Sequence, residues 1–205
     1  MKNILKILLI FFYLSANSQD VNGNKISKVF QVEGVNANDL FAKLNVVIAN
    51  TYNSANDVVQ LSDAESKKMV IKAIATIRIP NQARHYIGMA PDYADRDHDY
   101  TLNIAARDGR YKVEIDYQRG KTEYGVARYL PIMNPSDEYK AQQVDLARER
   151  AADAILVGKK KKERLYKNIP IDLETYATNL KNYANELFDR IFNEVLKANK
   201  DDDDW

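Results

Sequence analysis

The side chains best suited to chemistry lie in an acidic stretch just before residue 100. Asp95, Asp97 and Asp99 place carboxylate oxygens at the first, third and fifth positions of a pattern that resembles a calcium-binding loop. The pattern then departs from such a loop, because Tyr100 occupies the sixth position, which needs Gly, and Ala106 the twelfth, which needs Glu. We therefore expect a solvated polar loop, with a metal site at these three aspartates as the less favoured alternative.

The same region contains the only two histidines of the chain, His85 and His98. With the carboxylates of Asp92–Asp99 they could serve a metal-dependent or acid–base hydrolase if the loop brought them within hydrogen-bond reach of one another. The chain has no Gly-x-Ser-x-Gly, no phosphate-binding Gly-rich loop and no His-Glu-x-x-His. The sequence therefore assigns no catalytic residue and no cofactor, and a hydrolase is the minor hypothesis.

Two alternating runs, 99–107 and 110–117, follow and meet at Asp108-Gly109. This dipeptide is typical of a two-residue type I′ turn, in which both central residues have a positive φ. The turn fixes a register that gathers the apolar side chains on one side of a hairpin, in the pairs Ala106–Tyr111, Ile104–Val113, Leu102–Ile115 and Tyr100–Tyr117. The pattern predicts an antiparallel sheet with one buried and one solvated face.

The solvated face of the hairpin is the candidate binding surface. Its side chains include Asn103, Arg107, Arg110, Lys112 and Glu114. Polar and charged groups of this kind can contact a protein, a peptide or a glycan, although an exposed polar face is also the ordinary outcome for an antiparallel sheet. The surface is therefore a candidate for recognition and not for catalysis.

Hydrophobic periodicity predicts the elements that position this hairpin. Alternation predicts strands over 29–32, 57–61 and 68–79, with Pro80 ending the last of these and a polar connection over 81–98. Helical spacing predicts one helix from an N-cap at Asn36 to Tyr52 and another over 169–197. The order β-α-β-β-β-β-α predicts an α+β fold, with a curved antiparallel sheet of about five strands and the helices on one face.

Residues 118–168 form an insertion before the last helix. Ser136–Val157 is predicted to be an additional helix with a thin apolar stripe, which could pack against a copy of itself in a self-assembling structural component. Lys159–Lys162 is a basic run that could contact anionic lipid head groups, each charge adding about 1 kcal/mol near such a surface. It is more typically a solvated connection between helices.

The first 18 residues are typical of a signal peptide. Lys2 and Lys6 precede an apolar run that is shorter than the roughly 20 residues needed to span a bilayer, and a small-x-small cleavage site ends at Ser18. Cleavage near Ser18 removes two lysines and leaves 28 basic against 29 acidic side chains, a balance that does not favour nucleic-acid binding. The chain has no cysteine, which excludes disulfides and thiolate chemistry.

The mature chain is expected to have three parts. They are a flexible lead-in over 19–27, a single domain over 28–199 that includes the insertion, and an acidic tail over 200–205 that ends in Trp205. None of them has an apolar run long enough to span a bilayer. The leader predicts export to the periplasm or the cell exterior.

Several short motifs carry a likeness to a known family. They are Val29–Val35, Leu40-Phe41 at a helix start, Lys72-Ala73 in a long strand, Tyr100–Ile104 and Asp108–Lys112. Together they resemble a domain of unknown function with a TATA-binding-protein-like fold, over about Val29–Tyr117 and the last helix. The resemblance implies this α+β fold and a place among secreted Gram-negative envelope proteins, but no catalytic residue. These observations predict an exported cell-envelope binding module that acts through its polar sheet face or its insertion, with an envelope protein, peptide or glycan as partner.

Overall fold

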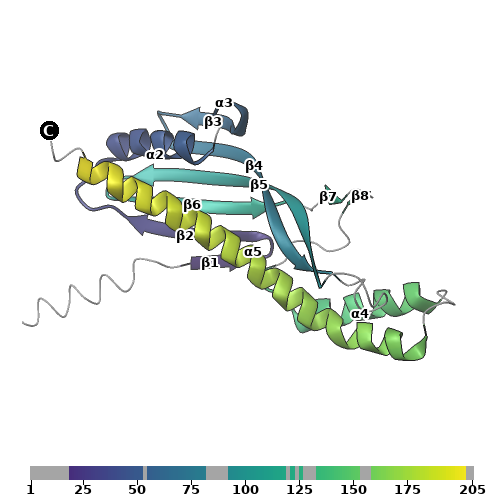
Figure 1. Ribbon diagram of the computed structural model, residues 1–205. Coiled ribbons are helices and arrows are strands. Elements are labelled where there is room, and N and C mark those ends of the chain that lie inside the picture. The colour runs from purple at the N-terminus through teal and green to yellow at the C-terminus, as the bar shows by residue number, and fades with distance from the viewer. Residues whose placement is uncertain are drawn as a thin grey trace, which may run out of the picture.

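The structure is a computed structural model (Figure 1) that describes residues 19–52, 55–81, 92–118, 121–122, 125–126, 133–152 and 158–201. The strands are β1 (Gln19–Asn22), β2 (Lys25–Gln31), β3 (Val59–Asp63), β4 (Lys68–Pro80), β5 (Tyr93–Arg107), β6 (Arg110–Tyr117), β7 (Lys121–Thr122) and β8 (Gly125–Val126). The helices are α2 (Ala37–Thr51), α3 (Ala55–Val58), α4 (Asp137–Ala152) and α5 (Lys159–Asp201). The predicted signal peptide and residues 202–205 of the predicted tail lie outside the described residues.

The main sheet is antiparallel and has six strands in the order β1-β2-β6-β5-β4-β3. Figure 1 shows α2 and α5 lying across the same face of this sheet. Alternate side chains of β4, β5 and β6 are buried, so that one face of the sheet forms the core beneath the two helices. The predicted α+β class is therefore confirmed, with six strands in the sheet instead of about five.

The β5–β6 hairpin has the predicted register. Tyr100 lies opposite Tyr117, Leu102 opposite Ile115, and Ile104 opposite Val113. All six of these side chains are buried. The alternation of the two runs was sufficient to fix the pairing, because a slip of one residue would move the apolar set to the solvated face.

The turn of this hairpin differs from the predicted type I′. Gly109 has a φ of 70°, whereas Asp108 does not have a positive φ. The tip is held by contacts with the β2–α2 connection. Gly109 N–H donates to the Val35 carbonyl at 2.8 Å, and the Asp108 carboxylate accepts from Ala37 N–H, also at 2.8 Å. These contacts favour a tip conformation that the dipeptide alone does not specify.

Residues 19–27 are ordered strands, and the prediction of a flexible lead-in is wrong. β1 pairs with β2 around Gly23, which has a φ of 61°, and Val21 lies opposite Ile26. The side-chain amide of Gln19 donates to Asn185 Oδ1 at 2.9 Å and so connects β1 to α5. Because β1 is an edge strand with mostly exposed side chains, its polar sequence carries no strand signal.

β5 begins at Tyr93, so the last residues of the predicted 81–98 connection are strand. It pairs with the whole 13-residue length of β4, from Lys68 opposite Ala105 to Pro80 opposite Tyr93. Aspartate has a low strand propensity, which concealed the start of β5. The pairing with β4 outweighs that propensity, because β4 lies beside β5 from Tyr93 to Ala105.

α5 is one helix of 43 residues, about 65 Å long at 1.5 Å per residue. Lys159–Lys162 forms its first turn and is not a connection between helices. Pro170 lies inside the helix, where its missing N–H leaves the Tyr166 carbonyl without its usual helical donor. This proline is the reason that the sequence predicted a helix start near residue 169.

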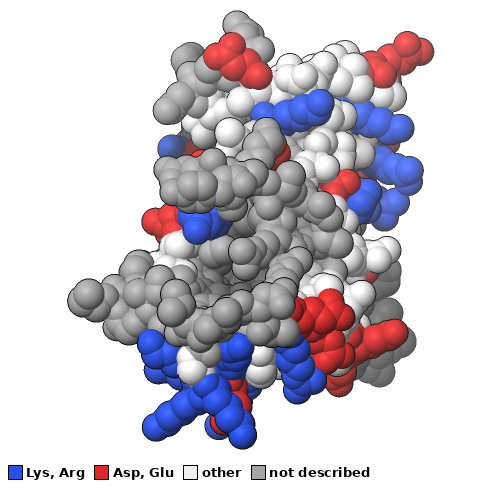
Figure 2. Space-filling model, turned by 90° about the vertical axis from the view of Figure 1, so that its right-hand side faces the viewer, with Lys and Arg blue, Asp and Glu red and all other residues white. Residues whose placement is uncertain are grey.

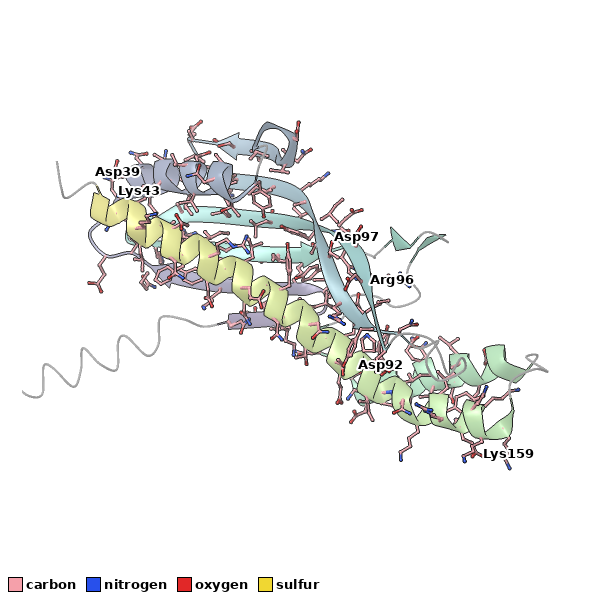
Figure 3. The ribbon with its side chains drawn as sticks, viewed as in Figure 1. Asp39, Lys43, Asp92, Arg96, Asp97 and Lys159 are labelled. Atoms are coloured by element: carbon pink, nitrogen blue, oxygen red, sulfur yellow. The ribbon has the colours of Figure 1, made fainter. Side chains whose placement is uncertain are left out.

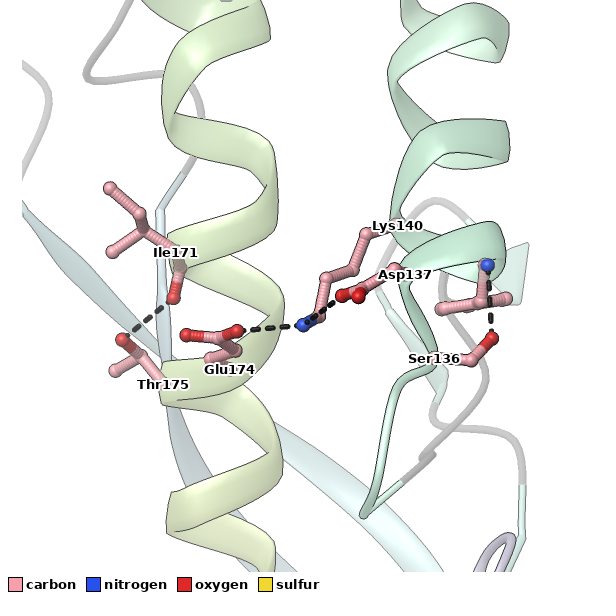
Figure 4. Close-up of polar contacts among 7 residues, drawn as sticks. Ser136, Asp137, Lys140, Ile171, Glu174 and Thr175 are labelled. Atoms are coloured by element: carbon pink, nitrogen blue, oxygen red, sulfur yellow. Dashed lines mark hydrogen bonds and ion pairs between the residues drawn. The ribbon is translucent and has the colours of Figure 1, made fainter.

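We call α4 together with Lys159–Leu173 of α5 the arm, because these segments extend beyond the sheet (Figure 1). Its small core consists of Leu165, Ile169 and Leu173, against which four half-buried side chains pack, Tyr139, Val144, Ala147 and Tyr166. Figure 4 shows the Lys140 ammonium between Glu174 Oε1 at 2.7 Å and Asp137 Oδ1 at 3.1 Å. The described apolar side chains of α4 therefore pack against α5 of the same chain, and self-assembly through this helix stays a prediction. Residues 153–157 of that predicted helix lie outside the described residues.

Candidate functional site

The sheet has a second face, opposite α2 and α5, which we call the outer face. Along β5 its side chains alternate with core side chains, so that Asp97, Asp99, Thr101 and Asn103 lie outward. The neighbouring strands present their own outward residues in register with these, because every pairing around β5 is antiparallel and continuous. The outer face is thus a surface built from several strands and not from the hairpin alone.

Three of the five predicted binding residues, Asn103, Lys112 and Glu114, lie together on the outer face. They line a hollow of about 230 Å³ that we call the central hollow, whose described lining is Lys68, Met69, Val70, Asn103, Ile104, Ala105, Lys112 and Glu114. Ala105 lies between Lys68 on β4 and Lys112 on β6 in one cross-strand row, and its small side chain leaves the space. The Lys112 ammonium is 3.0 Å from Glu114 Oε2.

The other two predicted residues, Arg107 and Arg110, lie at the hairpin tip and do not line the central hollow. They are directly opposite each other and both are exposed. Like charges in a cross-strand pair repel, which favours an anionic neighbour. The tip therefore adds positive charge at one end of the outer face.

The outward residues that β4 contributes to the central hollow, Lys68 and Val70, were not predicted from the sequence. They lie opposite Ala105 and Asn103 of β5. The alternation in β4 was the available signal for which of its residues face outward, but it could not give the register between two strands joined by a long connection. Only that register brings Lys68 to the same hollow as Lys112.

A second hollow of about 520 Å³ lies further along the outer face. Its described lining is Lys72, Ala73, Ile74, Asp99, Tyr100, Thr101 and Gln118. The backbone N–H of Gln118 donates to the Asp99 carbonyl at 2.7 Å, which fixes the chain as it leaves β6. Of the three predicted metal ligands, only Asp99 lines this hollow.

Asp95, Asp97 and Asp99 lie on a strand, so the interpretation as a calcium-loop-like segment is wrong. Alternate residues of a strand are about 6.6 Å apart along the chain, and an extended backbone cannot wrap three such carboxylates around one ion. Asp97 Oδ1 instead accepts a hydrogen bond from the Thr76 hydroxyl at 2.8 Å, and Figure 3 shows Asp97 on β5. In the part of the chain that the structure describes, no group of three or more His, Asp or Glu side chains could hold a metal ion.

His98 lies on the opposite side of β5 from these aspartates and is 1% exposed. Its Nε2 is 3.1 Å from the Tyr176 hydroxyl on α5. Burial lowers the pKa of His98. This lowering is larger than the increase in pKa caused by the Gln118 backbone and by the negative charges of Asp97 and Asp99. The His98 imidazole is in the core and the carboxylates of Asp95, Asp97 and Asp99 are on the outer face, so His98 does not act together with these aspartates. His85 lies outside the described residues.

The basic run Lys159–Lys162 lies at the far end of the arm, where Figure 3 labels Lys159. Lys159, Lys160 and Lys161 are exposed, and Lys and Arg side chains gather at the bottom of Figure 2, the end of the molecule at which the arm lies. None of the helices within the described ranges is both long enough and apolar enough to cross a bilayer. Contact of this run with a lipid surface stays a prediction.

Comparison with known proteins supports the fold and not an activity. Residues 27–118, which extend from β2 to just past β6, match the family described as a domain of unknown function (DUF4468) with TBP-like fold. No curated protein matches the chain. The matched range contains the predicted hairpin and the long strand β4.

Two solved structures resemble most of the chain. A TBP-like protein from Parabacteroides distasonis ATCC 8503 is 12% identical, with a TM-score of 0.51 over 84% of this chain and 92% of that one. A DUF4468 family protein from Bacteroides ovatus ATCC 8483 is 14% identical, with a TM-score of 0.54 over 88% of this chain and 90% of that one. Identities this low show a shared fold alone. Residues 27–118 therefore match the family of domains of unknown function (DUF4468) with TBP-like fold, and the chain shares this fold.

Proposed function

We propose that the protein is an exported cell-envelope module that binds a protein partner through its outer face. The observation that carries the proposal is the central hollow, where an amide, two ammonium groups and a carboxylate surround a small apolar floor. Residues from three adjacent strands converge there. Such a mixture of polar groups around apolar surface is typical of protein recognition sites.

The size of the central hollow favours a protein side chain over a free small molecule. Its volume of about 230 Å³ is below the roughly 300–1,000 Å³ usual for small-molecule sites. Arg107 and Arg110 pair with each other at the neighbouring tip, where the one carboxylate between them in the chain, that of Asp108, accepts from Ala37 N–H. The expected partner therefore presents an apolar side chain flanked by acidic residues.

The place of the protein in the envelope rests on the sequence. Residues 1–18 have the charged start, the short apolar run and the small-x-small site of a cleaved leader. A chain without cysteine needs no oxidative folding, so its stability comes from the core described above. Cell fractionation with mass determination tests this part: a cytosolic protein that retains residues 1–18 would overturn export.

A crosslinking experiment tests the binding surface. Because the chain has no cysteine, Asn103→Cys provides a single thiol in the central hollow for a photoreactive label, and Asn193→Cys provides a matched thiol on an exposed part of α5. We expect one envelope protein to crosslink from position 103 and not from position 193. Adding Lys112→Glu should abolish that crosslink, because it reverses a charge of the hollow.

The result that contradicts the proposal is equally specific. Crosslinking to the same proteins from both positions, or a crosslink at position 103 that Lys112→Glu leaves unchanged, would show that the outer face does not select a partner. No crosslink at either position would have the same meaning for a protein expressed at its normal level in intact cells.

A further inference from the structure

A cavity of about 480 Å³ lies at the edge of the sheet, between the end of α2, the edge of β4 and α5. Its described lining is Thr51, Tyr52, Val58, Lys72, Ala73, Ile74, Tyr100, Tyr183, Leu187 and Arg190. We call it the tyrosine cavity. Its volume is within the roughly 300–1,000 Å³ typical of small-molecule sites.

The cavity has a structural cause in β4. The inward row of this strand contains two small residues, Ala73 and Ala75, between the larger Ile71 and Ile77. Ala73 lies opposite Tyr100, and the partner strand β3 pairs with β4 only as far as Ile71. The edge of β4 beyond Ile71 therefore has no described strand beside it, and small side chains leave space beneath the helices.

Three phenol rings form one side of the cavity. The hydroxyls of Tyr52 and Tyr100 are 2.8 Å apart, and the rings of Tyr100 and Tyr183 meet edge to face with centroids 6.0 Å apart. Burial raises the pKa of Tyr52 to about 12 and raises that of Tyr100 as well, so both phenols keep their protons at neutral pH. The Tyr100 hydroxyl also interacts with Tyr183, so two of the three hydroxyl protons are used within the cluster and the third can be donated to a ligand.

The charged side chains that line the cavity are positive. Lys72 and Arg190 are the charged residues of its described lining, and both are exposed. Neither makes a hydrogen bond or ion pair with another side chain of the described chain. A cleft whose lining contains two such cations and no carboxylate among the described residues attracts anions.

We propose that the tyrosine cavity binds a small organic anion, with a carboxylate or phosphate group near Arg190 and Lys72 and an apolar body against Ala73 and Leu187. The guanidinium can hold either oxyanion through two parallel hydrogen bonds. The phenols supply neutral donors and flat apolar surface for an aromatic or alkyl body. This site shares Lys72, Ala73, Ile74 and Tyr100 with the second hollow of the outer face. It has no lining residue in common with the central hollow and does not depend on the function proposed above.

Three matched probes test the ligand class: phenylacetate, phenyl phosphate and the neutral phenylacetamide. Each is titrated into the purified protein by calorimetry, and the amide resonances of Ala73 and Leu187 are followed by NMR. We expect both anions to shift these resonances and the neutral amide to bind about tenfold more weakly, because charge-assisted hydrogen bonds are the stronger ones. The ratio of the two anion affinities distinguishes a carboxylate from a phosphate ligand.

Variants connect the binding to this cavity. Arg190→Gln should weaken anion binding about tenfold, and Tyr183→Phe, which keeps the ring, by about threefold. Lys197→Gln removes an exposed charge from the same helix outside the cavity lining, and should leave the affinity unchanged. The proposal is wrong if either anion at about 10 mM leaves the Ala73 and Leu187 resonances unchanged, because only very weak binding would escape detection at that concentration. It is also wrong if phenylacetamide binds as tightly as the anions. The site is assigned wrongly if Lys197→Gln weakens anion binding as much as Arg190→Gln does.

Discussion

The body of the molecule and its arm share α5 but bury very different amounts of apolar surface. In the body, the six-stranded sheet, α2 and the part of α5 after Leu173 form one continuous core, with Phe30 stacked between Tyr111 and Phe192. In the arm, three buried residues of α5 are covered by α4, none of whose described side chains is buried. Tertiary packing supplies most of the stability of a helix, so we expect the arm to open well before the body unfolds.

The largest effect is expected from the middle of the body core. Ile115 is 0% exposed and lies between Ile26 of β2 and Leu102 of β5. Ile115→Ala should lower the free energy of unfolding by about 3 kcal/mol, because it leaves a cavity that the sheet cannot close. Urea denaturation followed by circular dichroism measures this loss. The exposed Gln31→Ala on β2 is the control, and an equal loss there would contradict the picture of a one-sided core.

A smaller and more local effect is expected from the arm. Ile169→Ala removes a buried side chain from its three-residue core, and the destabilisation is limited to about 2 kcal/mol because the arm can open without the body. Hydrogen exchange of α4 and of α5 before Pro170 should accelerate, while that of β5 and β6 stays slow.

Lys140→Gln is the matched control for the arm. It breaks the ion pair with Glu174, a carboxylate that is 61% exposed, and exposed pairs contribute at most about 1 kcal/mol. If β5 and β6 exchange faster together with the arm in Ile169→Ala, the two regions unfold as one unit and the comparison fails.

The smallest effect concerns the junction of the two regions, where His98 contacts Tyr176. Burial lowers the pKa of His98 in the folded protein, whereas the unfolded value is about 6.5. Above pH 6.5 the histidine is neutral in both states and does not change stability with pH. Between pH 6.5 and the lowered pKa of the folded protein, the unfolded state takes up more of the proton than the folded state does. The free energy of unfolding therefore falls as the pH falls, by at most about 1 kcal/mol over the first pH unit.

His98→Phe should remove this part of the pH dependence while it keeps an aromatic ring against Tyr176. Thermal unfolding of both proteins at pH 7.5, 6.5 and 5.5 measures the difference, and His85 is present in both proteins and cancels. An equal slope in the two proteins would mean that His98 is not buried as a neutral imidazole.

The features that sequence determined by itself are those that depend on near neighbours in the chain. The strict alternation from Tyr100 to Tyr117 fixes the hairpin register. The start of α2 is equally local, because the Asn36 side chain accepts from Asp39 N–H at 3.0 Å three residues away. The same alternation predicted that the side chains of Asn103, Lys112 and Glu114 lie on the solvated face of the sheet.

Only the tertiary structure decided the features that depend on residues far apart in the chain. The polar strand β1 is ordered by its pairing with β2, the acidic start of β5 by β4, and the first turns of α5 by packing against α4. The central hollow needs Lys68 beside Ala105, and the tyrosine cavity needs Tyr183 beside Tyr100. Local propensity is worth a fraction of a kcal/mol per residue, so burial and pairing with distant partners override it wherever the two disagree.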